Sequence, residues 1–173
     1  PRAAASWQMP PVIGSNLHYK TFESKAAGEK VSYLIYLPEA SEKNKDEHFP
    51  VVFWLHGVGG SQRGGPQMCE NFTAAIAQKK MPPIIIVFAN GMVDGFYNDA
   101  INAPHPLETV IIKELIPHVD AMYRTIAKRE ARMIEGFSMG GYGAGHFGFK
   151  YPELFGSISM IDAAVVDLST MKN

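Results

Sequence analysis

The feature that most constrains the fold of this 173-residue chain is the segment Glu135-Gly136-Phe137-Ser138-Met139-Gly140-Gly141. A mostly apolar run, 131–134, precedes it, and a segment of mainly small residues, 142–150, follows it. A Gly-x-Ser-x-Gly sequence between a strand and a helix is typical of a nucleophile elbow, the sharp turn that presents a reactive serine. The pattern therefore predicts Ser138 at the carboxyl end of a sheet, above a helix N-terminus that can stabilise negative charge.

A chance match in a glycine-rich loop is the alternative, because the chain contains 16 glycines. A second motif favours the elbow. The apolar segment 50–55 runs directly into His56-Gly57-Val58-Gly59-Gly60. In hydrolases with an α/β sheet, a glycine-rich loop after an early strand supplies a backbone N–H to the oxyanion. Taken alone, this segment also fits a plain glycine turn, but its place ahead of the Ser138 motif favours an oxyanion loop.

With these two motifs, three further segments resemble the esterase D and feruloyl/acetylxylan esterase group of α/β-hydrolases. Those segments are Tyr33–Pro38, Glu114–Asp120 and Lys150–Phe155. The five pieces occur in the order of that group and cover nearly all of 17–162. The resemblance implies a serine ester hydrolase with Ser138 as nucleophile and the N–H groups of Val58 and Met139 as oxyanion hole. It also implies a small-molecule ester substrate and no metal or organic cofactor.

The resemblance also identifies catalytic groups that the sequence does not supply in their usual place. In this fold an acid and then a histidine follow the nucleophile along the chain. The 35 residues after Ser138 contain one histidine, His146, which lies eight residues into the helix of the elbow. At 1.5 Å per residue it is about 12 Å from Ser138 along the axis, too far for a hydrogen bond. By this comparison we expect the domain to be incomplete at its C-terminus.

The other histidines are weighed as possible general bases. His56 and His105 are the two candidates that the predicted fold puts near the carboxyl end of the sheet. A histidine that braces the oxyanion loop is the alternative for His56, and a solvated loop residue is the alternative for His105. We interpret His118 as structural, and His18 and His48 as remote from the site.

Four residues are weaker candidates for the site. Asp162 ends the last predicted strand, where some lipases carry the acid of the triad; a polar strand end or helix cap is the alternative. Phe96 and Tyr97 lie in a loop that follows a central strand, on the side where open α/β sheets bind ligands. With Gly57 they are candidates for substrate contact, and ordinary packing over the sheet is the alternative for the two aromatic residues.

Alternation of β-like and helical segments after an antiparallel start predicts a doubly wound, mostly parallel α/β sheet. We expect an N-terminal extension at 1–16 and an α/β-hydrolase domain at 17–173. Strands are predicted at 17–23, 31–37, 51–55, 84–89, 133–137 and 157–161, and helices at 67–79 and 107–123, the second interrupted at Pro117. A charged loop is predicted at 38–49, and a short helix or frayed tail at 165–171.

Composition excludes several classes of partner. A formal net charge of −1 is not the footprint of a protein that binds nucleic acid or an anionic membrane. Cys69 is the single cysteine, so no internal disulfide forms, and no Cys/His cluster has structural zinc spacing. The longest apolar run, 83–89, is too short to span a bilayer. These features favour a soluble protein, either secreted or cytoplasmic.

Two questions stay open from the sequence. An acyltransferase of the same fold, or a non-catalytic fragment or binding module without a triad histidine, is the alternative to an esterase. If strands that usually follow 157–161 are missing, that strand has an unpaired edge, so we expect self-association or a companion chain there.

Overall fold

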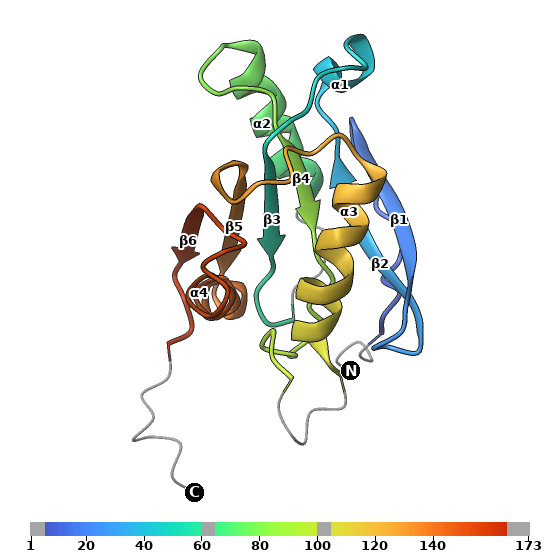
Figure 1. Cartoon of the computed structure of the whole chain (residues 1–173), viewed down its shortest axis with the longest axis vertical. Helices are drawn as coiled ribbons and strands as arrows, with labels where there is room; N and C mark the ends of the chain where they lie inside the picture. Colours follow the sequence, from blue (N-terminus) through green and yellow to red (C-terminus); the bar gives the residue numbers. More distant parts are fainter. Residues whose placement is uncertain (1–5, 60–64, 100–104, 166–173) are drawn as a thin grey trace, which may run out of the picture.

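The computed structural model describes residues 6–59, 65–99 and 105–165, which form a six-stranded sheet with helices on both faces (Figure 1). The strands are β1 (Leu17–Ser24), β2 (Glu29–Tyr36), β3 (Val51–Leu55), β4 (Ile85–Phe88), β5 (Arg132–Phe137) and β6 (Ser157–Ile161). They lie side by side in the order β1-β2-β4-β3-β5-β6. All six correspond to predicted strands. The start of β2 differs from the prediction by two residues, and every other strand end differs by one residue or none.

The pairing confirms the predicted doubly wound, mostly parallel sheet. β1 pairs antiparallel with β2, and β2 pairs antiparallel with β4. The pairs β3–β4, β3–β5 and β5–β6 are parallel. In the β3–β5 register Leu55 lies opposite Gly136, so the loop after β3 and the turn after β5 leave the same edge of the sheet side by side.

Two apolar layers cover the sheet. On one face α2 (Gly65–Ala77) packs through Cys69, Phe72 and Ile76. On the other face lie α4 (Met139–Lys150) and the helical segment that ends in α3 (Ile116–Met122). The central strand β4 is buried at every position because both of its faces are covered.

The long helix predicted at 107–123 is present but is not α-helical throughout. It runs as a π-helix, η2, over Thr109–Leu115 and continues as α3, with Pro117 in the first turn of α3. Proline has no N–H for an α-helical bond to the carbonyl four residues earlier, so a change of helix type at this position is physically reasonable.

Two further segments differ from the sequence-based expectation. The charged loop contains a short helix, α1 (Glu39–Lys43). Trp7, in the expected N-terminal extension, is buried in the main core, and its carbonyl accepts a hydrogen bond from the N–H of Ser32 on β2. Most of the tail predicted at 165–171 lies outside the described residues. Among the residues that are described, no helix has the length and apolar character needed to cross a bilayer.

Candidate active site

The backbone at Ser138 makes the sharp turn that the sequence predicts. Ser138 joins the end of β5 to the start of α4 with φ 54° and ψ −115°. A positive φ is uncommon for a residue with a side chain, and strained positions of this kind persist where the surrounding structure enforces them. Here the Ser138 N–H donates to the carbonyl of Ile161 at the end of β6, and the Ser138 carbonyl accepts from the N–H of Tyr142.

Two glycines allow the turn to form. A Cβ atom on Gly136 would lie 2.1 Å from the carbonyl oxygen of Gly140, and one on Gly140 would lie 1.9 Å from the carbonyl oxygen of Leu55. Both distances are far inside van der Waals contact, and the opposing atoms belong to the backbone. The first turn of α4 therefore sits directly on the ends of β3 and β5, which any larger residue at these two positions would prevent.

The glycine loop after β3 lies beside the serine. A Cβ atom on Gly57 would be 3.3 Å from the Cβ of Ser138 and 3.3 Å from the carbonyl oxygen of Phe137. The next residue, Val58, is 49% exposed, as expected for a loop at the surface of a site. Met139 is the first residue of α4, so its N–H has no carbonyl partner within the helix. The loop continues at Gly60, which lies outside the described residues.

His56 is engaged at both ring nitrogens. Its Nε2 lies 3.1 Å from the N–H of Gly91 and accepts that hydrogen bond, so the proton of the neutral ring is on Nδ1, which donates to the Gly57 carbonyl at 2.9 Å. Burial lowers the pKa of His56, against the opposing effect of the Gly57 hydrogen bond. A neutral imidazole with both nitrogens bound to backbone groups braces the loop and has no free nitrogen for Ser138.

The other histidines near the sheet also have partners. The His146 Nε2 lies 2.8 Å from a carboxylate oxygen of Glu108. The ring of His105 packs edge-on against Trp7 at 5.5 Å between centroids. His118 stacks on an aromatic residue of β1 and lies 3.1 Å from the hydroxyl of Tyr33, in agreement with a structural role. Among the described residues, none forms a hydrogen bond with the Ser138 hydroxyl.

Asp162 follows β6 at the same edge of the sheet as Ser138. It is exposed and has a positive φ of 45°. No histidine in the described ranges forms a hydrogen bond with its carboxylate. In the same ranges, no group of three His, Cys, Asp or Glu side chains is placed to hold a metal ion.

The two aromatic residues of the loop after β4 have different surroundings. Phe96 is partly exposed, packs edge-on against Tyr142 at 6.0 Å, and its N–H donates to the sulfur of Met139 at 3.4 Å. Tyr97 is 0% exposed. The expectation that Tyr97 contacts substrate is therefore corrected: its ring is needed to fill space between the loops and α4, whereas Phe96 can still line the site.

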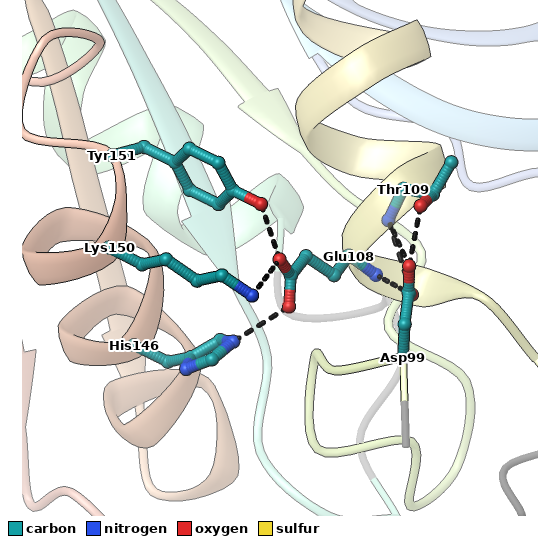
Figure 2. Close-up of polar contacts among 6 residues, drawn as sticks. All are labelled: Asp99, Glu108, Thr109, His146, Lys150 and Tyr151. Carbon is teal, nitrogen blue, oxygen red and sulfur yellow. Dashed lines mark hydrogen bonds and ion pairs between the residues drawn. The ribbon is translucent and has the colours of Figure 1, made fainter. Parts of the chain in front are cut away.

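A buried carboxylate that the sequence did not reveal ties α4 to the opposing helix. Figure 2 shows Glu108, directly before η2, surrounded by three side chains from the end of α4 and just beyond it: His146, Lys150 and Tyr151. The Lys150 ammonium is 2.6 Å away, and the Tyr151 hydroxyl donates to the same carboxylate oxygen. Beside this cluster, Asp99 accepts from the N–H groups of Glu108 and Thr109 and caps the helix.

The Glu108 cluster makes a prediction about acid stability. Burial would raise the pKa of Glu108, but hydrogen bonds from Lys150, Tyr151 and His146 outweigh it and lower the pKa from 4.5 to about 2. A lowered pKa stabilises the fold above the unfolded value, and that stabilisation is lost as the pH falls from about 4.5 toward 2. We expect Glu108→Gln to lower the free energy of unfolding by up to about 3 kcal/mol at pH 7 and by roughly half that or less at pH 3.

Denaturant unfolding at the two pH values measures this difference. Glu153→Gln is the matched control, because Glu153 is exposed and lies two residues after Tyr151. A destabilisation of Glu108→Gln that is the same at pH 3 and pH 7 would show that the charge of the cluster is not its source.

The chain is similar to known proteins over most of its length. Residues 24–171 match the family described as "Putative esterase". An endo-1,4-beta-xylanase/feruloyl esterase of Xylanibacter ruminicola is 32% identical over 149 residues, which are 82% of this chain and 20% of that protein. An esterase of Mycobacterium tuberculosis is 32% identical over 146 residues, 83% of this chain and 31% of the relative.

The fold is shared with solved structures. A ferulic acid esterase superimposes with a TM-score of 0.79 at 27% identity, covering 85% of this chain and 60% of that one. The chain thus spans between a fifth and a third of the two curated relatives and about three fifths of this solved structure.

Proposed function

Because the chain belongs to the esterase family of α/β-hydrolases, we propose that it is a serine carboxylic-ester hydrolase with Ser138 as its nucleophile. One observation carries the proposal: Ser138 occupies the strained turn between β5 and α4, and the glycine loop after β3 packs directly against it. A strained turn that presents the serine, a glycine loop beside it and a helix N-terminus are the features that support acyl transfer to serine in this fold.

The proposed reaction has two steps that share one oxyanion site. The Ser138 Oγ attacks the ester carbonyl carbon while its proton passes to a base, and the N–H groups of Val58 and Met139 stabilise the tetrahedral oxyanion. The intermediate collapses with protonation and release of the alcohol, which leaves an acyl ester on Ser138. Water then attacks this ester and forms a second tetrahedral oxyanion. Its collapse releases the carboxylic acid and free serine.

Proton transfer from Ser138 needs a base, and none of the described residues forms a hydrogen bond with the Ser138 hydroxyl. The serine hydroxyl at its ordinary pKa is a weak nucleophile and needs a base, usually a histidine. His56 is held by two backbone groups and His146 by Glu108, so neither is free for Ser138. Asp162 is our candidate for the acid, since it follows β6 at the edge of the sheet where Ser138 lies.

The surroundings of Ser138 support a substrate with an apolar acyl group. Phe137, adjacent to the nucleophile, is 46% exposed, and Val58, which follows Gly57 in the neighbouring loop, is 49% exposed. Exposed apolar side chains of this size at a site favour contact with an apolar group of a ligand. We propose small acyl esters as substrates, including acetyl and feruloyl esters, a range that includes the activities named for the relatives in X. ruminicola and the solved ferulic acid esterase.

Active-site labelling tests the proposal. A fluorophosphonate is expected to form a stoichiometric adduct, which peptide mass spectrometry locates at Ser138. Hydrolysis of p-nitrophenyl acetate and ethyl ferulate is measured in parallel, with and without added imidazole. Acceleration by imidazole beyond its own reaction with the ester, measured without protein and with Ser138→Ala, indicates that the base is not among the histidines of this chain. Absence of both adduct and hydrolysis contradicts the esterase proposal and favours a non-catalytic binding module.

A further inference from the structure

The ring of Tyr97 is clamped between the elbow helix and the loop after β4. A Cβ atom on Gly143 of α4 would lie 2.6 Å from the Cδ2 of Tyr97, and one on Gly91 would lie 2.2 Å from its hydroxyl oxygen. Both glycines therefore leave room for this one ring. Phe96 and Tyr97 have φ values of 48° and 53°, a left-handed backbone that residues with side chains rarely adopt. The loop holds a strained conformation in which the ring reaches this position.

The hydroxyl of Tyr97 binds the loop after β3. It donates to the main-chain carbonyl of His56 at 2.9 Å. Burial raises the pKa of Tyr97, so the hydroxyl keeps its proton and remains a donor. Two more hydrogen bonds join the same two loops: Gly91 N–H to the His56 ring at 3.1 Å, and Gly59 N–H to the Val93 carbonyl at 2.7 Å.

These contacts control the orientation of one peptide group. The Nδ1–H of His56 holds the Gly57 carbonyl at 2.9 Å. A trans peptide is planar, so its N–H points opposite to its C=O, and the described residues contain no cis peptide bond. Holding the Gly57 carbonyl toward the His56 ring therefore directs the Val58 N–H away from it. That orientation lasts only while His56 itself cannot rotate.

From this geometry we infer that Tyr97 is a positioning residue for the oxyanion site. Its ring packs against α4 and so fixes the position of the loop after β4. Its hydroxyl binds the His56 carbonyl, and the His56 ring binds the Gly57 carbonyl and so orients the Gly57–Val58 peptide. Tyr97 thereby links the nucleophile helix to the second oxyanion N–H without touching substrate. This inference rests on the proposed function, because it assigns the Val58 N–H to the oxyanion.

Removal of one oxygen atom tests the inference. Tyr97→Phe keeps the ring between Gly143 and Gly91 but loses the bond to His56. We expect kcat for p-nitrophenyl acetate to fall about tenfold with KM within about twofold, because the lost interaction acts mainly in the transition state. Amide hydrogen exchange at Gly59 and Gly91, whose N–H groups bond across the two loops, is expected to accelerate in the same variant.

Tyr36→Phe is the matched control. Tyr36 is also fully buried, and its hydroxyl lies 2.9 Å from the Thr73 hydroxyl, within the layer between the sheet and α2. This variant loses a partly buried hydrogen bond on the other face, so some fall in thermal midpoint with unchanged kcat and unchanged exchange at Gly59 and Gly91 is expected.

The outcomes separate this inference from the proposed function. Wild-type kcat and wild-type exchange in Tyr97→Phe, or equal losses of kcat in both variants, would overturn the positioning role. A wild-type protein that neither hydrolyses esters nor reacts with fluorophosphonate contradicts the proposed function instead. In that case the exchange at Gly59 and Gly91 still decides whether Tyr97 holds the loop.

Discussion

Ser138→Ala is expected to reduce hydrolysis of p-nitrophenyl acetate by at least about three orders of magnitude, because loss of a serine nucleophile leaves only the catalysis of the oxyanion site and of binding. Alanine removes one oxygen atom and keeps the Cβ that faces Gly57. The turn should therefore survive the change. Steady-state hydrolysis and fluorophosphonate labelling of the variant measure the effect, and circular dichroism with thermal unfolding checks that the fold is intact.

The control for this substitution is Ser157→Ala. Ser157 is exposed at the start of β6, where it pairs with Met133 at the opposite end of the sheet from Ser138. The control should retain full activity. Full esterase activity in a folded Ser138→Ala protein would show that another group is the nucleophile.

Gly140→Ala is expected to disrupt both the fold and the activity. The new methyl group would be 1.9 Å from the carbonyl oxygen of Leu55 and 2.9 Å from that of His56. Neither carbonyl can withdraw without moving β3 or the loop that follows it. Overpacking usually lowers stability by about 1–3 kcal/mol, and contact with two successive backbone carbonyl groups places this variant at or beyond the upper end. Denaturant unfolding measures the loss of stability, and fluorophosphonate labelling measures the loss of the turn.

Gly65→Ala is a matched substitution in another helix. A Cβ atom on Gly65, in the first turn of α2, has its nearest contact at 3.5 Å, which is ordinary packing distance. Alanine also favours a helix over glycine by roughly 1 kcal/mol, so this variant should be as stable as the wild type or more stable. Equal stability of the two variants would mean that α4 does not approach β3 as closely as the structure indicates.

The parts of the fold that the sequence predicted are those set by local pattern. Continuous apolar runs gave the positions of β3 and β4, since strands covered on both faces need apolar residues at every position. The spacing of glycines around Ser138 predicted the elbow. Each of these glycines is required because backbone atoms a few residues away or on the adjacent strand leave no room for a side chain. The order of these segments predicted the parallel sheet.

The parts that the sequence did not reveal depend on contacts between distant residues. Glu108 and His146 are 38 residues apart, and nothing near either one signals a buried carboxylate cluster. In the sequence, nothing distinguishes Tyr97 from an exposed aromatic residue that lines a site. Its burial depends on Gly143, 46 residues later, which leaves room for the ring. Trp7 belonged to an apparent extension, and only its contact with the core shows that this part of the chain packs on the sheet.

The glycines of α4 have a consequence for how the protein loses activity. Five of the twelve residues of α4 are glycine, and each weakens an isolated helix by about 1 kcal/mol relative to alanine. The segment therefore has little tendency to be helical by itself and owes its structure to docking on β3, β5 and β6. We therefore expect the turn at Ser138 to unfold locally before the apolar layers elsewhere in the sheet separate. Catalytic activity should consequently be lost at a lower denaturant concentration than the circular dichroism signal. Activity then reports the stability of the weakest cooperative unit and not the average stability of the protein.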